Sequence, residues 1–244
     1  MEINGGLITK DDLANYKVAE REPIIGTYKD YRIVSMPPSS SGGVHLIQML
    51  NMLEPFPLKE MGFGSAESIH LMTEVMKRAY ADRSKYLGDT DFVSVPLKGL
   101  TSKKYANDLL KEISLSKASS SKEISEGNPI PYESPDTTHF SVMDKQGNVV
   151  ANTYTLNFSY GSGIVIPGTG ILMNNEMDDF SSKKGVPNAY GLVGFEANEI
   201  EGEKRPLSSM TPTIVFKDKK PYLVLGSPGG SRICLLYTSP SPRD

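Results

Sequence analysis

Pro135-Asp136-Thr137-Thr138-His139-Phe140-Ser141-Val142-Met143-Asp144 is the stretch of this sequence that says most about its fold. Polar and apolar residues alternate through its second half, and a similar run at 149–155 follows the turn Asp144-Lys145-Gln146-Gly147. Two such runs around a short polar turn predict a β-hairpin. The hairpin would hold Thr137 near Thr155, so that a hydroxyl residue stands at the very start of a strand.

The rest of the chain shows helical patterns first and strand patterns later. We expect a short helix after the capping sequence Thr9-Lys10-Asp11-Asp12, a strand at 31–36, amphipathic helices at about 44–53 and 65–86, and a third marked by Tyr105, Leu109 and Ile113. The run 37–43 is expected to break the first strand, and 114–133 to be an exposed linker. Strand signals return at 170–173, 211–216 and 222–226, and 181–203 is predicted to be a long loop. This order favours a layered α/β sandwich.

Composition indicates one globular domain. The 244 residues are 38% hydrophobic with a net charge of -3, so a core can form. Basic residues are scattered among acids, which argues against a nucleic-acid partner. No apolar run approaches the roughly 18 residues that a membrane span needs, and residues 1–5 lack the pattern of a signal peptide. The single cysteine, Cys234, excludes an internal disulfide.

Five short motifs extend the pattern of the hairpin. They are the Asp136-Thr137 pair with its hairpin, Asn157 just beyond it, Met173-Asn174-Asn175-Glu176-Met177-Asp178-Asp179-Phe180, Pro206-Leu207-Ser208-Ser209-Met210, and Gly226-Ser227-Pro228-Gly229-Gly230-Ser231-Arg232. Each alone is weak, but in this order and spacing they resemble the γ-glutamyltranspeptidase family. The resemblance runs from about Asn4 to Ile233.

The resemblance implies an αββα four-layer sandwich of the N-terminal-nucleophile hydrolase type, incomplete at both ends. Residues 1–136 would be the C-terminal part of a large subunit and 137–233 the N-terminal part of a small subunit, both cut from one precursor and sharing one domain. The family is typically periplasmic or secreted. Residues 234–244 match a translated sequencing adapter, and we expect them to be a non-native tail.

A threonine hydroxyl needs a base to act as a nucleophile, and His45, His70 and His139 lack the context of a serine-hydrolase triad. A free α-amine has a pKa of about 7.7–8.0, against about 10.4 for lysine, so an N-terminal threonine can serve as its own base. In the family, Thr137 would first cleave the Asp136–Thr137 bond and then attack γ-glutamyl amides such as glutathione. Water, an amino acid or a peptide would accept the group, and no cofactor is implied.

The resemblance also assigns roles to the remaining motif residues. Gly229 and Gly230 would form the oxyanion hole, and Thr155 would hydrogen-bond the nucleophile. The substrate α-amino group would be held by Asn157, Glu176 and Asp179, and the α-carboxylate by Ser208 and Ser209. Tyr190 matches a lid tyrosine. Taken alone, Gly229-Gly230 would be a tight turn and Asp178-Asp179 a solvated acidic turn.

Two other functions remain open from the sequence. A β-lactam side-chain acylase of the same superfamily would take a glutaryl-type substrate, which has no α-ammonium for Glu176 and Asp179 to bind. A non-catalytic relic or protein-binding domain would keep only the fold, and the intact set of motif residues weighs against it. The carboxylate-binding arginine of the family is expected upstream, because Arg32, Arg78 and Arg83 do not stand in its motif.

Overall fold

The computed structural model describes residues 5–121, 123–129, 138–189 and 191–228. Its elements follow in the order α1 (Lys10–Asn15), β1 (Ile24–Tyr28), β2 (Tyr31–Ser35), α2 (Gly42–Leu53), α3 (Leu58–Met61), α4 (Ala66–Tyr86), α5 (Leu97–Leu100), α6 (Lys103–Leu110), β3 (Thr138–Met143), β4 (Val149–Tyr154), η2 (Glu176–Asp179), η3 (Glu196–Asn198), β5 (Thr213–Lys217) and β6 (Lys220–Leu225).

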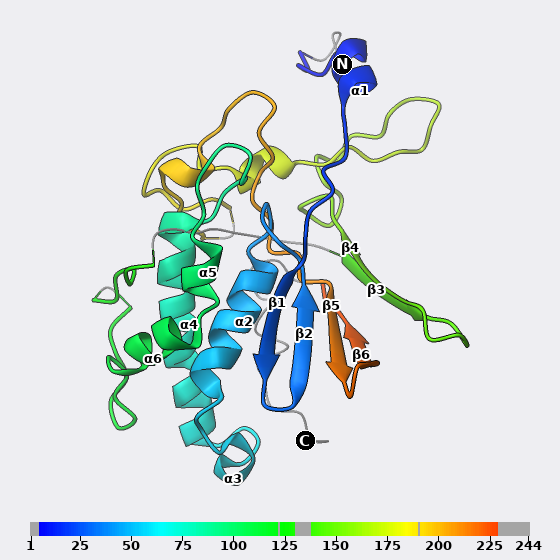
Figure 1. Ribbon diagram of the computed structural model, residues 1–244. Helices are drawn as coiled ribbons and strands as arrows, with labels where there is room; N and C mark the ends of the chain where they lie inside the picture. Colours follow the sequence, from blue (N-terminus) through cyan, green and yellow to red (C-terminus); the bar gives the residue numbers. More distant parts are fainter. Residues whose placement is uncertain (1–4, 122, 130–137, 190, 229–244) are drawn as a thin grey trace.

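Four antiparallel strands form the main sheet in the order β1-β2-β5-β6 (Figure 1). Its centre joins distant parts of the chain, because Ile33 of β2 pairs with Val215 of β5. Strand β1 was not predicted from the sequence, since a glycine inside a strand weakens the pattern. Gly26 lets α2 approach the sheet closely: a Cβ there would lie 2.7 Å from Cγ2 of Ile47.

The predicted hairpin is confirmed as β3 and β4. Thr138 pairs with Tyr154 and Met143 with Val149, and Gly147 in the turn has a φ of 89°. This two-stranded sheet lies near β5 and β6 (Figure 1). Several large apolar side chains on the hairpin are exposed, namely Phe140, Val142, Val150 and Tyr154.

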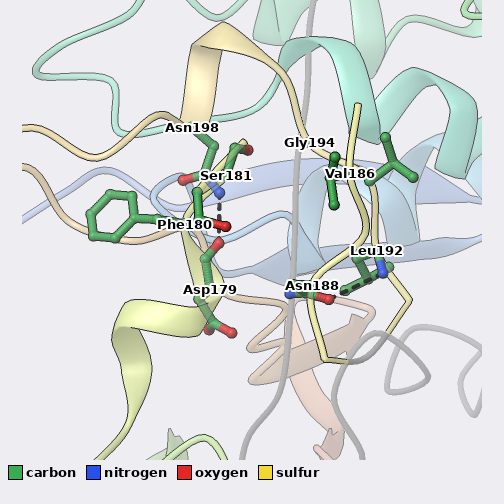
Figure 2. A pocket seen from close by; sticks show the side chains of 10 residues that line it. Asp179, Phe180, Ser181, Val186, Asn188, Leu192, Gly194 and Asn198 are labelled. Atoms are coloured by element: carbon green, nitrogen blue, oxygen red, sulfur yellow. Dashed lines mark hydrogen bonds between the residues drawn. The ribbon is translucent and has the colours of Figure 1, made fainter. Parts of the chain in front are cut away.

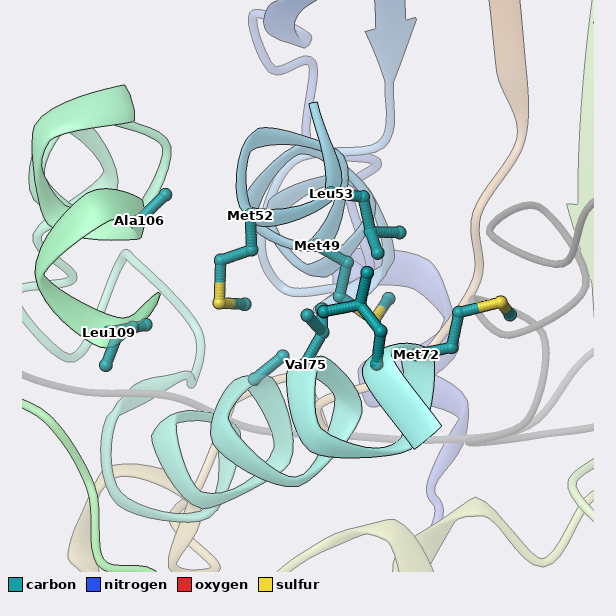
Figure 3. Close-up of a cluster of buried hydrophobic side chains, with 9 residues drawn as sticks. Met49, Met52, Leu53, Met72, Val75, Ala106 and Leu109 are labelled. Carbon is teal, nitrogen blue, oxygen red and sulfur yellow. The ribbon is translucent and has the colours of Figure 1, made fainter. Parts of the chain in front are cut away.

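A helical layer covers one face of the main sheet (Figure 1). Helix α2 packs on β1 and β2, and α4 and α6 pack on α2. The two long helices were predicted correctly, whereas α6 ends at Leu110, before Ile113. Their facing side chains form a buried core of Met49, Met52, Leu53, Leu71, Met72, Val75, Ala79, Ala106 and Leu109, most of them labelled in Figure 3.

Strand β2 ends at Ser35, in agreement with the predicted break at 37–43, and the glycine pair at the end of that run already belongs to α2. Gly42 and Gly43 are its first two residues, and both are buried. A Cβ on Gly42 would lie 2.1 Å from Oγ1 of Thr211, and one on Gly43 would lie 2.3 Å from the carbonyl oxygen of Met36. The glycines are therefore needed for close approach of the helix start to 209–211, a role that local propensity does not reveal.

The irregular regions agree in part with the predictions. The capping box of α1 forms, with Thr9 as N-cap and Asp12 completing it. The strand expected at 170–173 does not form, because only Leu172 makes an isolated bridge, to Val165. The described residues of the predicted loop and linker contain no strand and only the short η3. No helix in the described part of the chain is both long and apolar enough to cross a bilayer.

Candidate active site

The structure describes six of the predicted site residues: Thr155, Asn157, Glu176, Asp179, Ser208 and Ser209. The others, namely Asp136, Thr137, Tyr190, Gly229 and Gly230, lie outside the described residues. The six fall into two groups, one at the end of β4 and one beside the start of α2.

The first group begins at the turn after β4. The hydroxyl oxygen of Thr155 accepts a 2.8 Å hydrogen bond from the backbone N–H of Asn157. Asn157 is buried and has a φ of 70°, in the left-handed region that asparagine tolerates better than most residues. Its Nδ2 donates to the carbonyl oxygen of Asn175 over 3.1 Å. The bent backbone thus turns Asn157 toward η2.

Asn175 joins this turn to η2 and was not predicted as a site residue. Its backbone N–H donates to the carbonyl oxygen of Leu156 over 3.1 Å, and its Oδ1 accepts from the N–H of Phe158 over 3.0 Å. Its side chain and backbone are both engaged with 156–158. The next residue, Glu176, begins η2, so the start of η2 is attached to 156–158 through Asn175.

Asp179 lies at the other end of η2 and is buried, with 2% of its surface exposed. Its carbonyl oxygen accepts a 2.7 Å hydrogen bond from Nδ2 of Asn198, and the carbonyl of Asn198 accepts from the N–H of Ser181 over 2.8 Å (Figure 2). Asn198 thus bridges the two sides of this loop. An acidic turn was the simpler alternative for Asp179, but a solvated turn would not bury the residue.

A small hollow adjoins Asp179 and is lined by parts of the predicted lid loop (Figure 2). On its far side the N–H of Asn188 donates to the carbonyl of Leu192 over 2.8 Å, and the N–H of Leu192 donates to Oδ1 of Asn188 over 3.1 Å. These two bonds hold Asn188 and Leu192 together at the hollow beside Asp179, and the predicted lid residue, Tyr190, lies outside the described residues.

The second group, Ser208 and Ser209, rests on the serine run before α2. The N–H of Ser208 donates to the carbonyl of Ser39 over 3.0 Å, and its own carbonyl accepts from the N–H of Ser41 over 2.8 Å. The hydroxyl of Ser40 donates to the carbonyls of Ser208 and Met210, at 3.1 and 2.8 Å. This contact was not predicted for the break at 37–43, although three consecutive serines signal a polar contact.

Arg83 of α4 reaches Ser209 from the protein interior. Its Nη2 donates to Oγ of Ser209 over 3.2 Å, and both residues are fully buried. The guanidinium also lies 5.6 Å from the ring centre of Tyr80. Burial, and then the charge of Arg83, hold the pKa of the His45 imidazole well below its usual value, so this buried histidine is neutral.

Both groups of predicted site residues are supported by the C-terminal end of α4. Arg83 lies in its last turn, and Gly88 follows just after it. A Cβ on Gly88 would lie 2.2 Å from the carbonyl oxygen of Ala197, so the residue next to Asn198 packs closely on the helix end. Asp179, through Asn198, and Ser209, through Arg83, are therefore both supported by α4.

This arrangement can be compared with known proteins. A sequence model described as Gamma-glutamyltranspeptidase matches residues 1–238. The chain belongs to the γ-glutamyltranspeptidase family.

Relatives within this family agree along most of the chain. It is 60% identical over 233 residues to the glutathione hydrolase proenzyme of Escherichia coli K12, covering 96% of this chain and 40% of that protein. A crystal structure of Helicobacter pylori γ-glutamyltranspeptidase is 49% identical with a TM-score of 0.51, covering 52% of this chain and 36% of that one. The chain therefore spans about 40% of the length of the curated relative it matches.

A more distant solved structure shows the breadth of the fold. The cephalosporin acylase of Bacillus halodurans is 28% identical to this chain with a TM-score of 0.79, covering 96% of this chain and 39% of that one. The α/β fold is thus common to members of the γ-glutamyltranspeptidase family and to an acylase. The fold alone therefore does not distinguish the substrate of a γ-glutamyltranspeptidase from that of an acylase.

Within the family fold, three residues that the sequence analysis did not assign to the site hold predicted site residues in place: Arg83, Asn175 and Asn198. Asn175 stands inside the motif 173–180 and was within reach of that analysis. Arg83 and Asn198 act across the fold and carry no local signal. Among the described residues, no cluster of three His, Cys, Asp or Glu side chains is arranged to hold a metal ion.

Proposed function

We propose that the protein containing this chain transfers or hydrolyses the γ-glutamyl group of glutathione and related γ-glutamyl amides. The proposal rests on two groups of side chains that the same end of α4 supports. The first, which we call the acidic group, contains Asp179, and the second, the serine group, contains Ser208 and Ser209. A γ-glutamyl group has an ammonium and a carboxylate on the same carbon. It therefore needs acceptors beside donors.

The acidic group suits the ammonium. Asn157 donates to the carbonyl of Asn175, the residue before Glu176, and Asp179 supplies a buried carboxylate at the other end of η2. Carboxylate and amide oxygens accept hydrogen bonds from an ammonium, and the carboxylates add charge attraction. We assign these three residues to the substrate α-amino group.

The serine group suits the carboxylate. An arginine can only donate, so Oγ of Ser209 accepts from Arg83, and the proton of Ser209 can be donated to Oγ of Ser41 at 3.3 Å or to a bound carboxylate. The backbone of Ser208 is fixed by Ser39 and Ser41. We assign Ser208 and Ser209 as donors to the substrate α-carboxylate. The main carboxylate-binding arginine is expected elsewhere in the protein.

The proposed chemistry uses Thr137 twice. Its Oγ attacks the carbonyl carbon of Asp136, the peptide nitrogen becomes the α-amine of Thr137, and water hydrolyses the resulting ester. The freed amine then takes the hydroxyl proton as Oγ attacks the substrate γ-amide, and the amine product leaves. Water or an acceptor amine resolves the γ-glutamyl ester. Gly229 and Gly230 would stabilise the oxyanions, Thr155 would orient Thr137, and Tyr190 would act as a lid.

Family resemblance supports further proposals about the whole protein. Residues 1–136 and 137–233 would belong to the large and small subunits, which is consistent with β2 and β5 sharing one sheet. The exposed apolar side chains of β3 and β4 would be covered by the remaining layers of a four-layer sandwich. A periplasmic or secreted location follows from the family, and residues 234–244 would be a non-native tail.

The acylase alternative predicts a different substrate preference. A glutaryl group lacks the ammonium, so it would make no charge-assisted hydrogen bond with the buried Asp179. Assay of the full-length protein with matched γ-glutamyl and glutaryl anilides separates the two functions. Faster turnover of the glutaryl compound would favour the acylase, and no turnover of either by a correctly folded protein would favour a relic.

Self-cleavage is tested in the same full-length protein. Intact mass and terminal sequencing should show a small subunit that begins Thr137-Thr138-His139-Phe140. Thr137→Ala should remain one chain and be inactive. Thr137→Ser should cleave more slowly, because the hydroxyl persists but the methyl group that restricts its rotamer is lost. Cleavage of the alanine variant at the same bond would rule out Thr137 as the nucleophile.

A further inference from the structure

The hydroxyl of Ser209 lies between a charged donor and a second hydroxyl. Nη2 of Arg83 approaches Oγ of Ser209 to 3.2 Å from α4, and Oγ of Ser41, the residue before α2, lies 3.3 Å from the same atom. All three side chains are fully buried. A hydroxyl has one proton to donate and two lone pairs that accept, so its two neighbours decide where that proton points.

The bonding of Ser41 determines which of the two serines donates. Oγ of Ser41 donates to the carbonyl oxygen of Ser208 over 3.2 Å, which uses its only proton. The contact between the two hydroxyls must then be donated by Ser209. At 3.3 Å this bond is longer than the usual range of about 2.5–3.0 Å for two oxygens, so it is weak and can be exchanged for a better one.

Arg83 acts on the other side of the same hydroxyl. Because an arginine has no acceptor, Oγ of Ser209 accepts from it, and the positive charge polarises the O–H bond. A polarised hydroxyl is a stronger donor to an anion. Arg83 stands in the last turn of α4, where the helix dipole favours a cation, and its guanidinium carbon lies 5.6 Å from the ring centre of Tyr80.

We propose that Arg83 and Ser41 are positioning residues for the Ser209 hydroxyl. Arg83 directs and strengthens its donation to the substrate α-carboxylate, and Ser41 accepts its proton until the substrate binds. This inference rests on the proposed function, which assigns Ser209 to that carboxylate. A carboxylate oxygen is a stronger acceptor than a hydroxyl, so on binding the proton turns from Ser41 to the substrate. Arg83 thereby selects for a carboxylate through Ser209.

The first test replaces Arg83 in the full-length protein. Arg83→Met keeps an unbranched side chain but removes the charge and the donors. We expect it to raise KM for a γ-glutamyl anilide about fivefold or more with little change in kcat, because the hydroxyl loses its fixed direction and its polarisation. KM for a 4-aminobutyryl anilide, which lacks the carboxylate, should change little. Arg83→Lys keeps a charged donor and should recover part of the loss.

A double-mutant cycle separates this role from a general effect on folding. In a Ser209→Ala background, Arg83→Met should have little further effect on KM, because the hydroxyl through which it acts is gone. Arg83→Lys takes its place in the cycle if Arg83→Met does not fold. Arg78→Met is the matched control, since Arg78 is also buried on α4 but bonds to Glu74 and to the carbonyl of Glu112. It should lower the thermal midpoint and leave the ratio of the two KM values unchanged.

Ser41→Ala tests the second positioning residue without removing a charge. The change takes away the acceptor that competes with the substrate, while the Ser208 carbonyl keeps its bonds from the backbone N–H of residue 41 and from the hydroxyl of Ser40. We expect KM for the γ-glutamyl anilide to fall about two- to tenfold. Ser40→Ala is the control, because that hydroxyl donates to the carbonyls of Ser208 and Met210, and it should not lower KM.

The possible outcomes are distinct. If Ser209→Ala raises KM but Arg83→Met does not, or if Arg83→Met causes the same loss with and without the Ser209 hydroxyl, the role of Arg83 is overturned and the proposed function stands. An unchanged or raised KM in Ser41→Ala would overturn the role of Ser41.

Two other results would reach further. An equal effect of Ser209→Ala on both anilides would remove Ser209 from the carboxylate site, and the inference with it. Absence of γ-glutamyl turnover by the folded wild-type protein would overturn the proposed function itself.

Discussion

Nη2 of Arg83 donates a 3.2 Å hydrogen bond to Oγ of Ser209, a residue 126 positions later in the chain. Both side chains are fully buried. Because a guanidinium has no acceptor, this contact fixes the direction of the serine hydroxyl: its oxygen faces Arg83 and its proton faces away. Oγ of Ser41 lies 3.3 Å from Oγ of Ser209, within hydrogen-bond distance of that proton.

Ser209→Ala is predicted to weaken binding of substrates that carry an α-carboxylate. The loss of one hydrogen bond to a charged group corresponds to about 1.5–3 kcal/mol, or a KM raised roughly 10- to 150-fold. A 4-aminobutyryl anilide, which lacks the carboxylate, is the matched substrate and should show little change. Steady-state kinetics on both substrates decide the matter, and an equal loss on both would remove Ser209 from the carboxylate site.

Asp179→Ala is predicted to impair γ-glutamyl substrates far more than glutaryl analogues. Only the former lose a charge-assisted bond to an ammonium. Asp178→Ala is the matched control, since that residue is adjacent and less buried. The ratio of kcat/KM for the two substrates is the quantity to measure. A similar drop in both would contradict the assignment of Asp179.

Replacement of Tyr190 by alanine is predicted to change the partition between hydrolysis and transfer while self-cleavage continues at nearly the normal rate. The residue is proposed to limit the access of water to the acyl-enzyme, and it supplies no chemistry. Product analysis at a fixed acceptor concentration measures the partition between hydrolysis and transfer. An equal partition in the variant and its parent would show that Tyr190 is not a lid.

Stability is predicted to fall in acid through Glu74. Burial would raise the pKa of this carboxyl, but hydrogen bonds from Lys77, Ser119 and Arg78 outweigh burial and lower it to about 2 from 4.5. A depressed carboxyl pKa stabilises the folded state above the unfolded value, and this contribution is lost as the pH falls from about 4.5 towards 2. The side chain of Lys77 is partly exposed, so solvent screens part of its attraction to Glu74. We therefore expect Glu74 to contribute about 1–2 kcal/mol to the free energy of unfolding.

Glu74→Gln tests this expectation by denaturant unfolding of the Thr137→Ala protein between pH 3 and 7. The variant should be less stable than its parent at neutral pH and should converge with it in acid. Glu67→Gln, in the exposed first turn of the same helix, is the control. A constant gap across the whole pH range would show that the charge of Glu74 is not the cause.

Gly42→Ala is predicted to destabilise the folded protein by about 1–3 kcal/mol, because the added methyl group meets Thr211 and Met210 where the start of α2 touches the serine group. Gly202→Ala, where nothing lies within 4 Å of the added carbon, should be neutral. Thermal unfolding of both variants gives the comparison. A neutral Gly42→Ala would mean that the helix start moves freely from 209–211.

Local patterns were sufficient to predict much of the secondary structure. The helical spacing of apolar residues located α2 and α4, and alternation around Gly147 located the β3–β4 hairpin. These elements depend on contacts between residues close in sequence, so their signals lie within short windows. The motifs also indicated the family. Each of them, such as Ser208-Ser209 or the 173–180 motif, is a short contiguous run, so the motifs and their order can be seen in the sequence alone.

Tertiary structure alone decided how these pieces support one another. Gly26 of β1 leaves room for the side chain of Ile47 on α2. The two glycines that begin α2 leave room for Thr211 and for the backbone of Met36. The contacts of Arg83 with Ser209 and of Asp82 with Gly127 join residues 126 and 45 positions apart. A buried charge or a fitted glycine is specified by what packs against it after folding, and periodicity along the chain carries no information about a partner that distant.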